Sequence, residues 1–197
     1  MSIALLLLGA GSASRMRGAD KLLEDVDGQP CLRVLSQRGL EAGLKVYVTL
    51  RPEDAPRRNA LARLDVTVID VPDAAQGMSR SLRAGAAAMP NKVSGMMVLP
   101  GDMPEITADD MRAMVSGFES APCMALRAVT EAGEPGHPII FARETFASFA
   151  ELNGDKGASG ILKQLGHQVQ TLALPGNRAR LDLDTPEAWA EWRAGRR

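Results

Sequence analysis

Residues 8–21 read Leu8-Gly9-Ala10-Gly11-Ser12-Ala13-Ser14-Arg15-Met16-Arg17-Gly18-Ala19-Asp20-Lys21. This stretch follows an apolar run, Ile3 to Leu8, and it gathers small residues first and cations afterwards. A glycine-rich turn can bring backbone N–H groups close to an anion because no side chain stands in the way. Arg15 and Lys21 add positive charge, so the stretch predicts a phosphate-binding loop. An ordinary surface turn with solvated cations is the alternative.

Two better-known phosphate loops fit this stretch less well. A Walker loop needs a Gly-Lys-Ser/Thr triplet, whereas Lys21 follows an aspartate and precedes a leucine, so that loop is excluded. The dinucleotide fingerprint fits Gly9 and Gly11 but has Ser14 in place of its third glycine. The acids at positions 25 and 27 also lie too near for the ribose-binding acid expected about 20 residues further on. An NAD(P)-dependent oxidoreductase therefore stays only as a rival interpretation.

Composition sets the class of protein. The 197 residues are 45% apolar and 24% charged, which predicts one globular α/β domain over residues 1–197. A formal net charge of −1 argues against a nucleic-acid partner. Cys31 and Cys123 have no metal-site or disulfide spacing and are expected as reduced thiols in or near the core. The apolar run Ile3 to Leu8 is far shorter than the roughly 20 residues that span a bilayer. It lacks a signal-peptide pattern, so we expect a soluble cytoplasmic protein without membrane contact.

Short apolar runs alternate with stretches of helical spacing, as in the βαβ units of a mostly parallel sheet with helices on both faces. The expected strands are Ile3–Leu8, Lys45–Leu50, Val66–Val71, Gly95–Leu99, Met124–Val129, Pro138–Phe141 and Val169–Leu174. The expected helices contain Leu32 to Leu40, Ser81–Met89, the segment after the Thr107–Asp110 capping box, Arg143–Leu152, Ala158–Leu165 and the segment after Thr185-Pro186-Glu187. Ligands of such sheets bind beyond the carboxyl ends of the strands. This rule selects loops 9–21, 51–56, 72–80, 100–106, 130–137 and 182–185.

Aspartates in two of these loops are candidate ligands of Mg²⁺. Asp102 lies just past an expected strand, in a turn with proline on both sides. Mg²⁺ is held by one or two carboxylates, with substrate phosphates and water completing its shell. Asp184 is our first candidate for a second acid and Asp182 the next, because an extended segment would point both to one face. The alternatives are that Asp102 hydrogen-bonds its own turn and that one of the later acids supports the helix start at Thr185.

Three further segments are candidates with weaker patterns. The helix start that contains Ser79 suits an anion or a base edge, although serines are also ordinary N-caps. His137 could line a second substrate pocket, with a structural histidine as the alternative. The turn 154–158 carries one cation, Lys156, for a second phosphate.

The chemistry expected from these parts is nucleotidyl transfer. The sequence shows no Ser-His-Asp or Cys-His arrangement, and a phosphate is already an anionic nucleophile at neutral pH. Catalysis can then come from positioning and from neutralising charge on the nucleotide phosphates.

The segment LGAGSASRMRGADK resembles the L-x-x-G-x-x-x-R-M-G-x-x-K signature of the molybdenum cofactor nucleotidyltransferases. Five later segments of the chain resemble later blocks of that family: LPGDMP, QGMSRSL, GHPIIF, GDKGASGIL and LDLDTPEA. The resemblance therefore covers most of the chain. It implies a Rossmann-like nucleotidyltransferase fold and Mg²⁺ dependence. It also implies transfer of a nucleoside monophosphate to a phosphorylated acceptor with release of pyrophosphate.

The resemblance also implies roles for individual residues. The backbone from Leu8 through Gly9 and Ala10 to Gly11 would hold the base and ribose side of the nucleotide, and Arg15 and Lys21 would hold the triphosphate. Asp102 matches the metal aspartate and Asp184 the second acid, while Asp73 falls near a nucleotide-contacting position. Independently of the resemblance, we assign His137 and Asp182 to the acceptor pocket. Ala10 resembles the cytidylyl branch, where the guanylyl branch has glycine. The matches to GMSRSL and GHPIIF also favour the cytidylyl branch.

Two residues depart from the family pattern. Arg17 stands where the family usually has the glycine after Arg-Met, and Gly9 replaces a common alanine. Neither change removes a charged group that the chemistry needs.

The expected activity is therefore transfer of CMP from CTP to molybdopterin. The alternatives are GTP as donor, a sugar or alcohol phosphate as acceptor, or a non-catalytic factor that holds nucleotide or cofactor for another enzyme. A molybdoenzyme or its chaperone is a possible transient partner.

Overall fold

A computed structural model describes residues 2–12, 14–154 and 157–196. Within these residues, the strands of the main sheet lie in the order β5 (Val66–Asp70), β4 (Lys45–Leu50), β1 (Ile3–Leu8), β6 (Gly95–Pro100), β8 (Pro135–Ala142), β7 (Ala125–Val129) and β9 (Val169–Ala173). β8 is antiparallel to both of its neighbours, and the other pairs are parallel. The expected mostly parallel sheet is confirmed.

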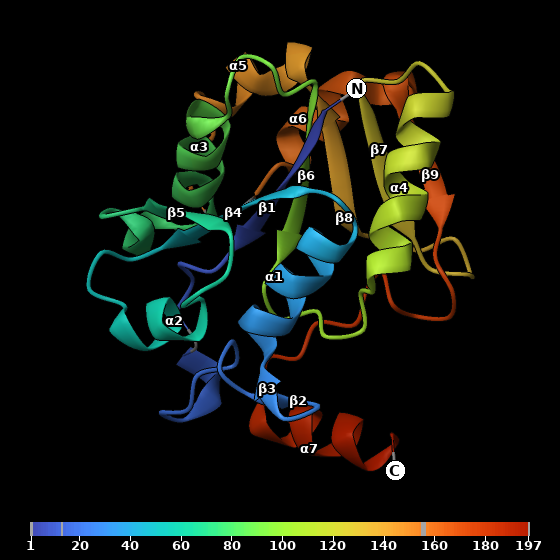
Figure 1. Ribbon diagram of the computed structural model, residues 1–197. Coiled ribbons are helices and arrows are strands. Elements are labelled where there is room, and N and C mark those ends of the chain that lie inside the picture. Colours follow the sequence, from blue (N-terminus) through green and yellow to red (C-terminus); the bar gives the residue numbers. More distant parts are fainter. Residues whose placement is uncertain (1, 13, 155–156, 197) are drawn as a thin grey trace.

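Helices cover both faces of this sheet (Figure 1). One face carries α1 (Cys31–Glu41) and α4 (Ala108–Ser120), and the other carries α3 (Met78–Ala88), α5 (Phe146–Phe149) and α6 (Ser159–Leu165). The central strand β1 is apolar throughout because both of its faces are buried. Leu5 and Leu7 pack in one cluster with Leu35 of α1, while Leu6 packs in the other with Leu82 of α3. Full burial of each leucine contributes about 2 kcal/mol relative to exposure.

Two glycines let the helices approach β1 closely. A methyl group at Gly39 of α1 would lie 2.5 Å from Leu5 Cδ2, and one at Gly85 of α3 would lie 2.2 Å from Leu6 Cδ2. Both distances are well below an ordinary carbon–carbon contact. The two helices can therefore sit against opposite faces of the same strand.

Several local elements differ from the expectations. The helix expected over 143–152 is a short turn, η3 (Arg143–Thr145), followed by α5, and α3 starts three residues before Ser81. The loop expected at 51–56 contains the start of α2 (Ala55–Ala60), which Asp54 caps by accepting a hydrogen bond from Arg57 N. A small hairpin, β2 (Asp25–Val26) and β3 (Gln29–Pro30), turns at Asp27 and Gly28, which both have positive φ as an Asp-Gly turn requires. The remaining short turns are η1 (Ser14–Met16), η2 (Ala74–Gln76) and η4 (Gly166–Gln168).

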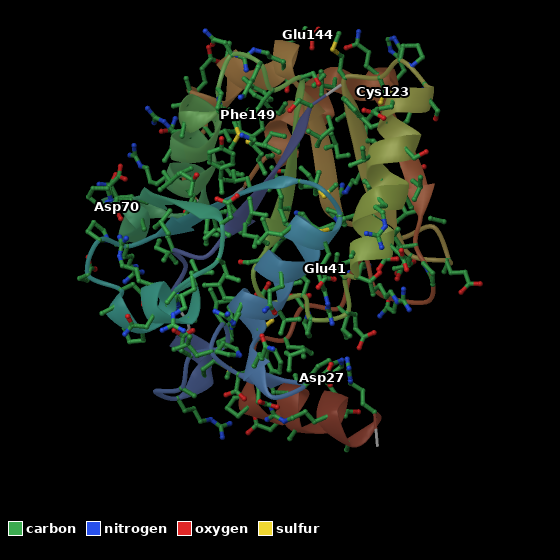
Figure 2. All side chains as sticks on the ribbon, viewed as in Figure 1. Asp27, Glu41, Asp70, Cys123, Glu144 and Phe149 are labelled. Atoms are coloured by element: carbon green, nitrogen blue, oxygen red, sulfur yellow. The ribbon has the colours of Figure 1, made fainter. Side chains whose placement is uncertain are left out.

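The C-terminal helix α7 (Pro186–Ala194) lies beneath the β2–β3 hairpin and the loop after β1, at the end of the molecule where the parallel strands finish (Figure 1). Trp189 is buried and donates from Nε1 to the carbonyl of Leu183 at 3.0 Å. Arg196 pairs with Asp27 of the hairpin at 2.8 Å, and Figure 2 shows Asp27 at this end. These contacts hold the segment before α7 against the carboxyl ends of β1 and β6.

Both cysteines are free thiols, with Cys31 buried and Cys123 partly buried, as expected. Among the described helices, none has the length and apolar character needed to cross a membrane.

Candidate functional site

A pocket of about 360 Å³ opens at the carboxyl ends of β1 and β6. Its lining comes from the loop after β1, the turn after β6, the residue that follows β4 and the start of α3. The lining residues are Leu8, Gly11, Ser12, Arg15, Lys21, Leu22, Arg51, Ala74, Ala75, Gly77, Met78, Ser81, Pro100, Gly101 and Asp102. This is the edge of the sheet that the strand-end rule selected.

Lys21 joins two acids from distant parts of the chain. Its Nζ lies 2.5 Å from Asp102 Oδ2 and 2.6 Å from Asp184 Oδ1. Arg15 reaches the same Asp184 from the solvent side, with Nη1 2.5 Å from Oδ2. The structure thus brings four predicted site residues into one cluster of two cations and two carboxylates at the pocket wall.

Backbone hydrogen bonds place the two carboxylates. The turn after β6 is held when Gly101 N donates to Leu8 O at 3.1 Å, which fixes Asp102 beside the end of β1. Leu183 N donates to Asp102 O at 3.0 Å, so the segment before α7 lies along this turn. Thr185 then caps α7 by accepting from Ala188 N at 3.2 Å. Asp184, between these two anchors, is directed at Lys21.

Burial shapes the electrostatics of this cluster. Burial raises the pKa of the Asp102 carboxyl, and the Lys21 ammonium opposes that rise without cancelling it. Burial lowers the pKa of Lys21, but the charges and hydrogen bonds of Asp102 and Asp184 outweigh it and raise the net pKa above its ordinary value. Lys21 is therefore a fixed cation at neutral pH.

Asp102 and Asp184 have the donor chemistry for a divalent cation. Asp102 Oδ1 is buried and has no hydrogen-bond partner among the described residues, which is costly unless a further ligand binds there. No group of three or more His, Cys, Asp or Glu side chains suited to a metal occurs in the ranges 2–12, 14–154 and 157–196. Two carboxylates suit Mg²⁺ or Mn²⁺ when phosphates and water fill the remaining positions around the ion. They are too few for a site in which the protein supplies every ligand.

Two arginines that the sequence reasoning did not single out belong to this region. Arg51 lines the pocket and donates from Nε to Ala10 O at 3.0 Å. Arg57 is buried and donates from Nη1 to Gly9 O at 2.5 Å and to Gly11 O at 2.9 Å. The strand-end rule had selected loop 51–56, which contains Arg51 and stops one residue short of Arg57. No sequence pattern indicated that their partners would be carbonyls of the first loop.

Arg17 has a defined place in the fold. Its φ is 51°, in the left-handed region where glycine is favoured, and this agrees with the glycine usual at this position in the resembled family. Its Nη1 lies 2.8 Å from Glu187 Oε1 in the first turn of α7. Arg17 therefore joins the first loop to the last helix.

Asp73 and Ser79 lie outside the lining of this pocket. Asp73 Oδ2 lies 3.3 Å from Arg80 Nε, and Ser79 is buried, with its backbone N donating to Gly154 O at 3.2 Å. Ser81, two residues further along α3, lines the pocket. Asp155 and Lys156 lie outside the described residues.

His137 lines a second pocket of about 220 Å³, which shares Leu8 and Met78 with the first. Burial, and then the positive charge of Arg127, lowers the pKa of His137 to about 4, so this imidazole is neutral at physiological pH. Asp182 is exposed, and in the part of the chain that the structure describes its carboxylate forms no ion pair. His137 therefore lines this second pocket, and Asp182 does not.

The fold and this cluster define a nucleotide-handling α/β protein, and comparison with known families gives a more specific result. Residues 5–169 match the family described as MobA-like NTP transferase domain, and the chain belongs to that family. It is a nucleotidyltransferase, an enzyme class that uses a nucleoside triphosphate and an acceptor. A comparison with curated protein sequences gave no match.

Solved structures resemble this fold over nearly the whole chain. Rv0371c from Mycobacterium tuberculosis H37Rv is 27% identical with a TM-score of 0.85, and the match covers 96% of each chain. A manganese complex of Rv0371c is 26% identical with a TM-score of 0.80 over 97% of each chain. CMP:2-keto-3-deoxy-manno-octonic acid synthetase complexed with CTP is 15% identical with a TM-score of 0.77, over 100% of this chain and 98% of that one. The expected Rossmann-like nucleotidyltransferase fold is confirmed.

Proposed function

We propose that this chain transfers CMP from CTP to molybdopterin, in a Mg²⁺-dependent reaction that releases pyrophosphate. The observation that carries the proposal is the position of Lys21 Nζ between Asp102 and Asp184 at the wall of the 360 Å³ pocket. Membership of the MobA-like NTP transferase family supports the reaction type.

The nucleotide would lie in the larger pocket, whose volume is within the range of ordinary ligand pockets. The backbone from Leu8 to Gly11 would contact its base and ribose, and Arg15 and Lys21 would contact its phosphates. Ala10 favours CTP through the resemblance to the cytidylyl branch. Ser81 and Arg51 are further candidates for nucleotide contacts because both line the pocket.

Asp102 and Asp184 would hold the divalent cation. Bound there, the ion would supply positive charge that offsets charge on the nucleotide phosphates. The unpartnered Asp102 Oδ1 supports this role. Mg²⁺ is the ion we propose, and the manganese complex of Rv0371c shows that a related chain was crystallised with a divalent cation.

In the proposed reaction, an oxygen of the acceptor's terminal phosphate attacks the α-phosphorus of CTP. A new phosphorus–oxygen bond forms, the bond from the α-phosphorus to the bridging oxygen of the β-phosphate breaks, and that oxygen leaves with pyrophosphate. Lys21 and Arg15 stabilise the charge on the triphosphate oxygens as it shifts toward the leaving group. No protein base is required because the attacking phosphate is already ionised.

The second pocket is our candidate for the acceptor. Its walls are largely apolar, with Leu82, Ile139 and Phe141 among them, and Arg127 and a neutral His137 are its ionisable groups within the described residues. An apolar wall suits the face of a flat ring system such as a pterin, whose polar edge would need hydrogen-bond partners such as Arg127 and His137. Asp73, Ser79 and Asp182 remain predicted contacts of lower structural support.

Three alternatives can be separated from this proposal by experiment. They are GTP as donor, a sugar or alcohol phosphate as acceptor, and a non-catalytic nucleotide-holding factor that delivers cofactor to a molybdoenzyme or its chaperone. We would measure thermal shifts with CTP, GTP, ATP and UTP in the presence of Mg²⁺, because a bound nucleotide stabilises the native state in proportion to its affinity. We would then measure pyrophosphate release with each candidate acceptor. A binding factor would show the shift but release no pyrophosphate, and the absence of any shift would contradict the whole proposal.

A further inference from the structure

Three consecutive carbonyl groups of the first loop are held by two arginines from the segment after β4. Arg57 Nη1 donates to Gly9 O and Gly11 O at 2.5 Å and 2.9 Å. Arg51 Nε donates to the carbonyl between them, Ala10 O, at 3.0 Å. All three carbonyl oxygens of this backbone segment therefore accept hydrogen bonds from arginine side chains.

The N–H groups that follow these three carbonyls, in contrast, have no hydrogen-bond acceptor among the described residues. In a trans peptide the C=O of one residue and the N–H of the next point in opposite directions. Fixing the carbonyls of residues 9–11 therefore turns the amides of Ala10, Gly11 and Ser12 away from the arginines. Within the described residues these three amides have no acceptor. Gly11 and Ser12 line the 360 Å³ pocket, so two of the three residues with open N–H groups lie at its wall.

Arg57 is itself held in place, because four of its five N–H groups donate to groups of the protein. Its side chain is 6% exposed. Nε and Nη2 donate to the two carboxylate oxygens of Asp20 at 2.7 Å and 2.9 Å, and Nε lies 3.2 Å from Asp54 Oδ2. Arg57 is also absent from the lining of the 360 Å³ pocket, so it is placed to position other groups rather than to contact the nucleotide. A lysine could not reproduce this pattern because an ammonium lacks the planar fork that serves a carboxylate and two carbonyls at once.

We propose that Arg57 is a positioning residue that keeps the backbone of residues 9–12 in its nucleotide-binding conformation, with Gly11 and Ser12 presenting open amides at the wall of the pocket. This inference rests on the proposed function, since it assumes a nucleoside triphosphate as the ligand. It adds a residue outside the first loop to the machinery that determines nucleotide affinity.

The test compares Arg57→Lys and Arg57→Met with a matched control, Arg33→Lys. Arg33 Nη1 donates to two carbonyls of the α2 end, Ala60 O at 2.8 Å and Ala62 O at 3.1 Å, so its loss removes similar bonds without touching the loop. CTP affinity with Mg²⁺ is measured by calorimetry, and thermal stability is measured on the same samples. We expect Arg57→Lys to weaken CTP binding about ten-fold and Arg57→Met to weaken it further. The control should bind within about two-fold of the wild type.

A second readout follows the loop directly. In ¹⁵N-labelled protein without nucleotide, Arg57→Lys should shift the amide resonances of Ala10, Gly11 and Ser12, and Arg33→Lys should leave them in place. A purely stabilising role predicts instead that both substitutions lower the melting temperature alike, with CTP affinity per folded molecule unchanged. That result, or unchanged amide resonances in Arg57→Lys, would overturn the inference.

Failure of the proposed function has a different signature. The wild-type chain would then bind none of the four nucleoside triphosphates. The amide resonances would still decide whether Arg57 sets the loop conformation, because that measurement needs no ligand.

Discussion

Lys21 Nζ lies 2.5 Å from Asp102 and 2.6 Å from Asp184, so one ammonium joins the turn after β6 to the segment before α7. The Lys21 side chain is 18% exposed, and water screens these interactions less than it screens surface ion pairs. Arg15 pairs with the same Asp184, so two cations and two carboxylates meet in this cluster. The relationship explains how a phosphate-binding cation and two metal-binding acids can share a small volume.

Lys21→Ala should reduce turnover by at least about 100-fold, because it removes the central cation of a preorganised charge-stabilising site. It should also destabilise the fold, since Asp102 loses its partner while remaining buried. Pyrophosphate release and melting temperature would be measured together, at a temperature where the variant is fully folded. Lys163→Ala, at an exposed position of α6, is the control and should match the wild type. Retained activity in Lys21→Ala would refute the assigned role.

Asp102→Asn keeps the shape of the side chain but removes its charge. We expect pyrophosphate release to fall by at least about 100-fold and the Mg²⁺ concentration for half-maximal rate to rise, because one of two carboxylate ligands is lost. Asp109→Asn is the control, since Asp109 is exposed in the first turn of α4. A Mg²⁺ titration of the rate checks both variants. An unchanged metal requirement in Asp102→Asn would remove this residue from the proposed metal site.

Arg17→Gly should leave stability within about 1 kcal/mol of the wild type. Relief of a left-handed φ favours the glycine by about 1–2 kcal/mol, whereas the greater freedom of glycine in the unfolded chain costs about 0.5–1 kcal/mol. The lost pair with Glu187 contributes little because both side chains are exposed. Urea unfolding of Arg17→Gly and Glu187→Gln would test this balance. A loss of several kcal/mol in Arg17→Gly would show that the link to α7 is a major stabilising contact.

His137 should make the fold less stable as the pH falls from about 6.5 to about 4. The folded protein holds this imidazole neutral with a pKa of about 4, whereas the unfolded chain protonates it near its ordinary pKa of about 6.5. Between these values the unfolded state binds more protons, so stability rises with pH, and this contribution is complete above pH 6.5. The size of the effect is on the order of 3 kcal/mol.

Urea unfolding across this pH range would measure it, with His137→Gln compared against the wild type. His137→Gln should show the smaller pH dependence. His167→Gln, at an exposed position in η4, is the control and should follow the wild type. Equal slopes for all three proteins would contradict the assignment to His137.

Gly9→Ala should destabilise the fold by about 1–3 kcal/mol, because overpacking against backbone cannot relax easily. The new methyl group would lie 2.9 Å from Thr49 O and 3.0 Å from Leu50 Cδ2. This crowding gives a physical reason for glycine where the resembled family commonly has alanine. Gly160→Ala is the matched control, because nothing lies within 4 Å of the added carbon and the residue is helical. We expect that control to be neutral or stabilising in thermal unfolding. An unchanged stability of Gly9→Ala would show that β4 can move enough to accommodate the methyl group.

Local structure was largely predictable because apolar runs, caps and turn residues act over short distances. The strand over Ile3–Leu8 and the capping box of Thr107 and Asp110 are found as expected. The short helix α2 and the β2–β3 hairpin were missed, although Asp27-Gly28 is a recognised hairpin turn. In place of the expected Arg143–Leu152 helix, the structure has a short turn at Arg143–Thr145 followed by the four-residue helix α5.

By itself, the sequence determined the α/β class, the loop that gathers small residues and cations, and the aspartate that follows the strand at Gly95–Pro100. These follow from periodicity and composition, which record what each residue needs from its immediate surroundings. Only the tertiary structure decided that Lys21 lies between Asp102 and Asp184, and that Arg57 holds the carbonyls of Gly9 and Gly11. Any acid can pair with a lysine and any carbonyl can accept from an arginine. The choice among these partners is made when the packed sheet and helices bring particular groups within hydrogen-bonding distance.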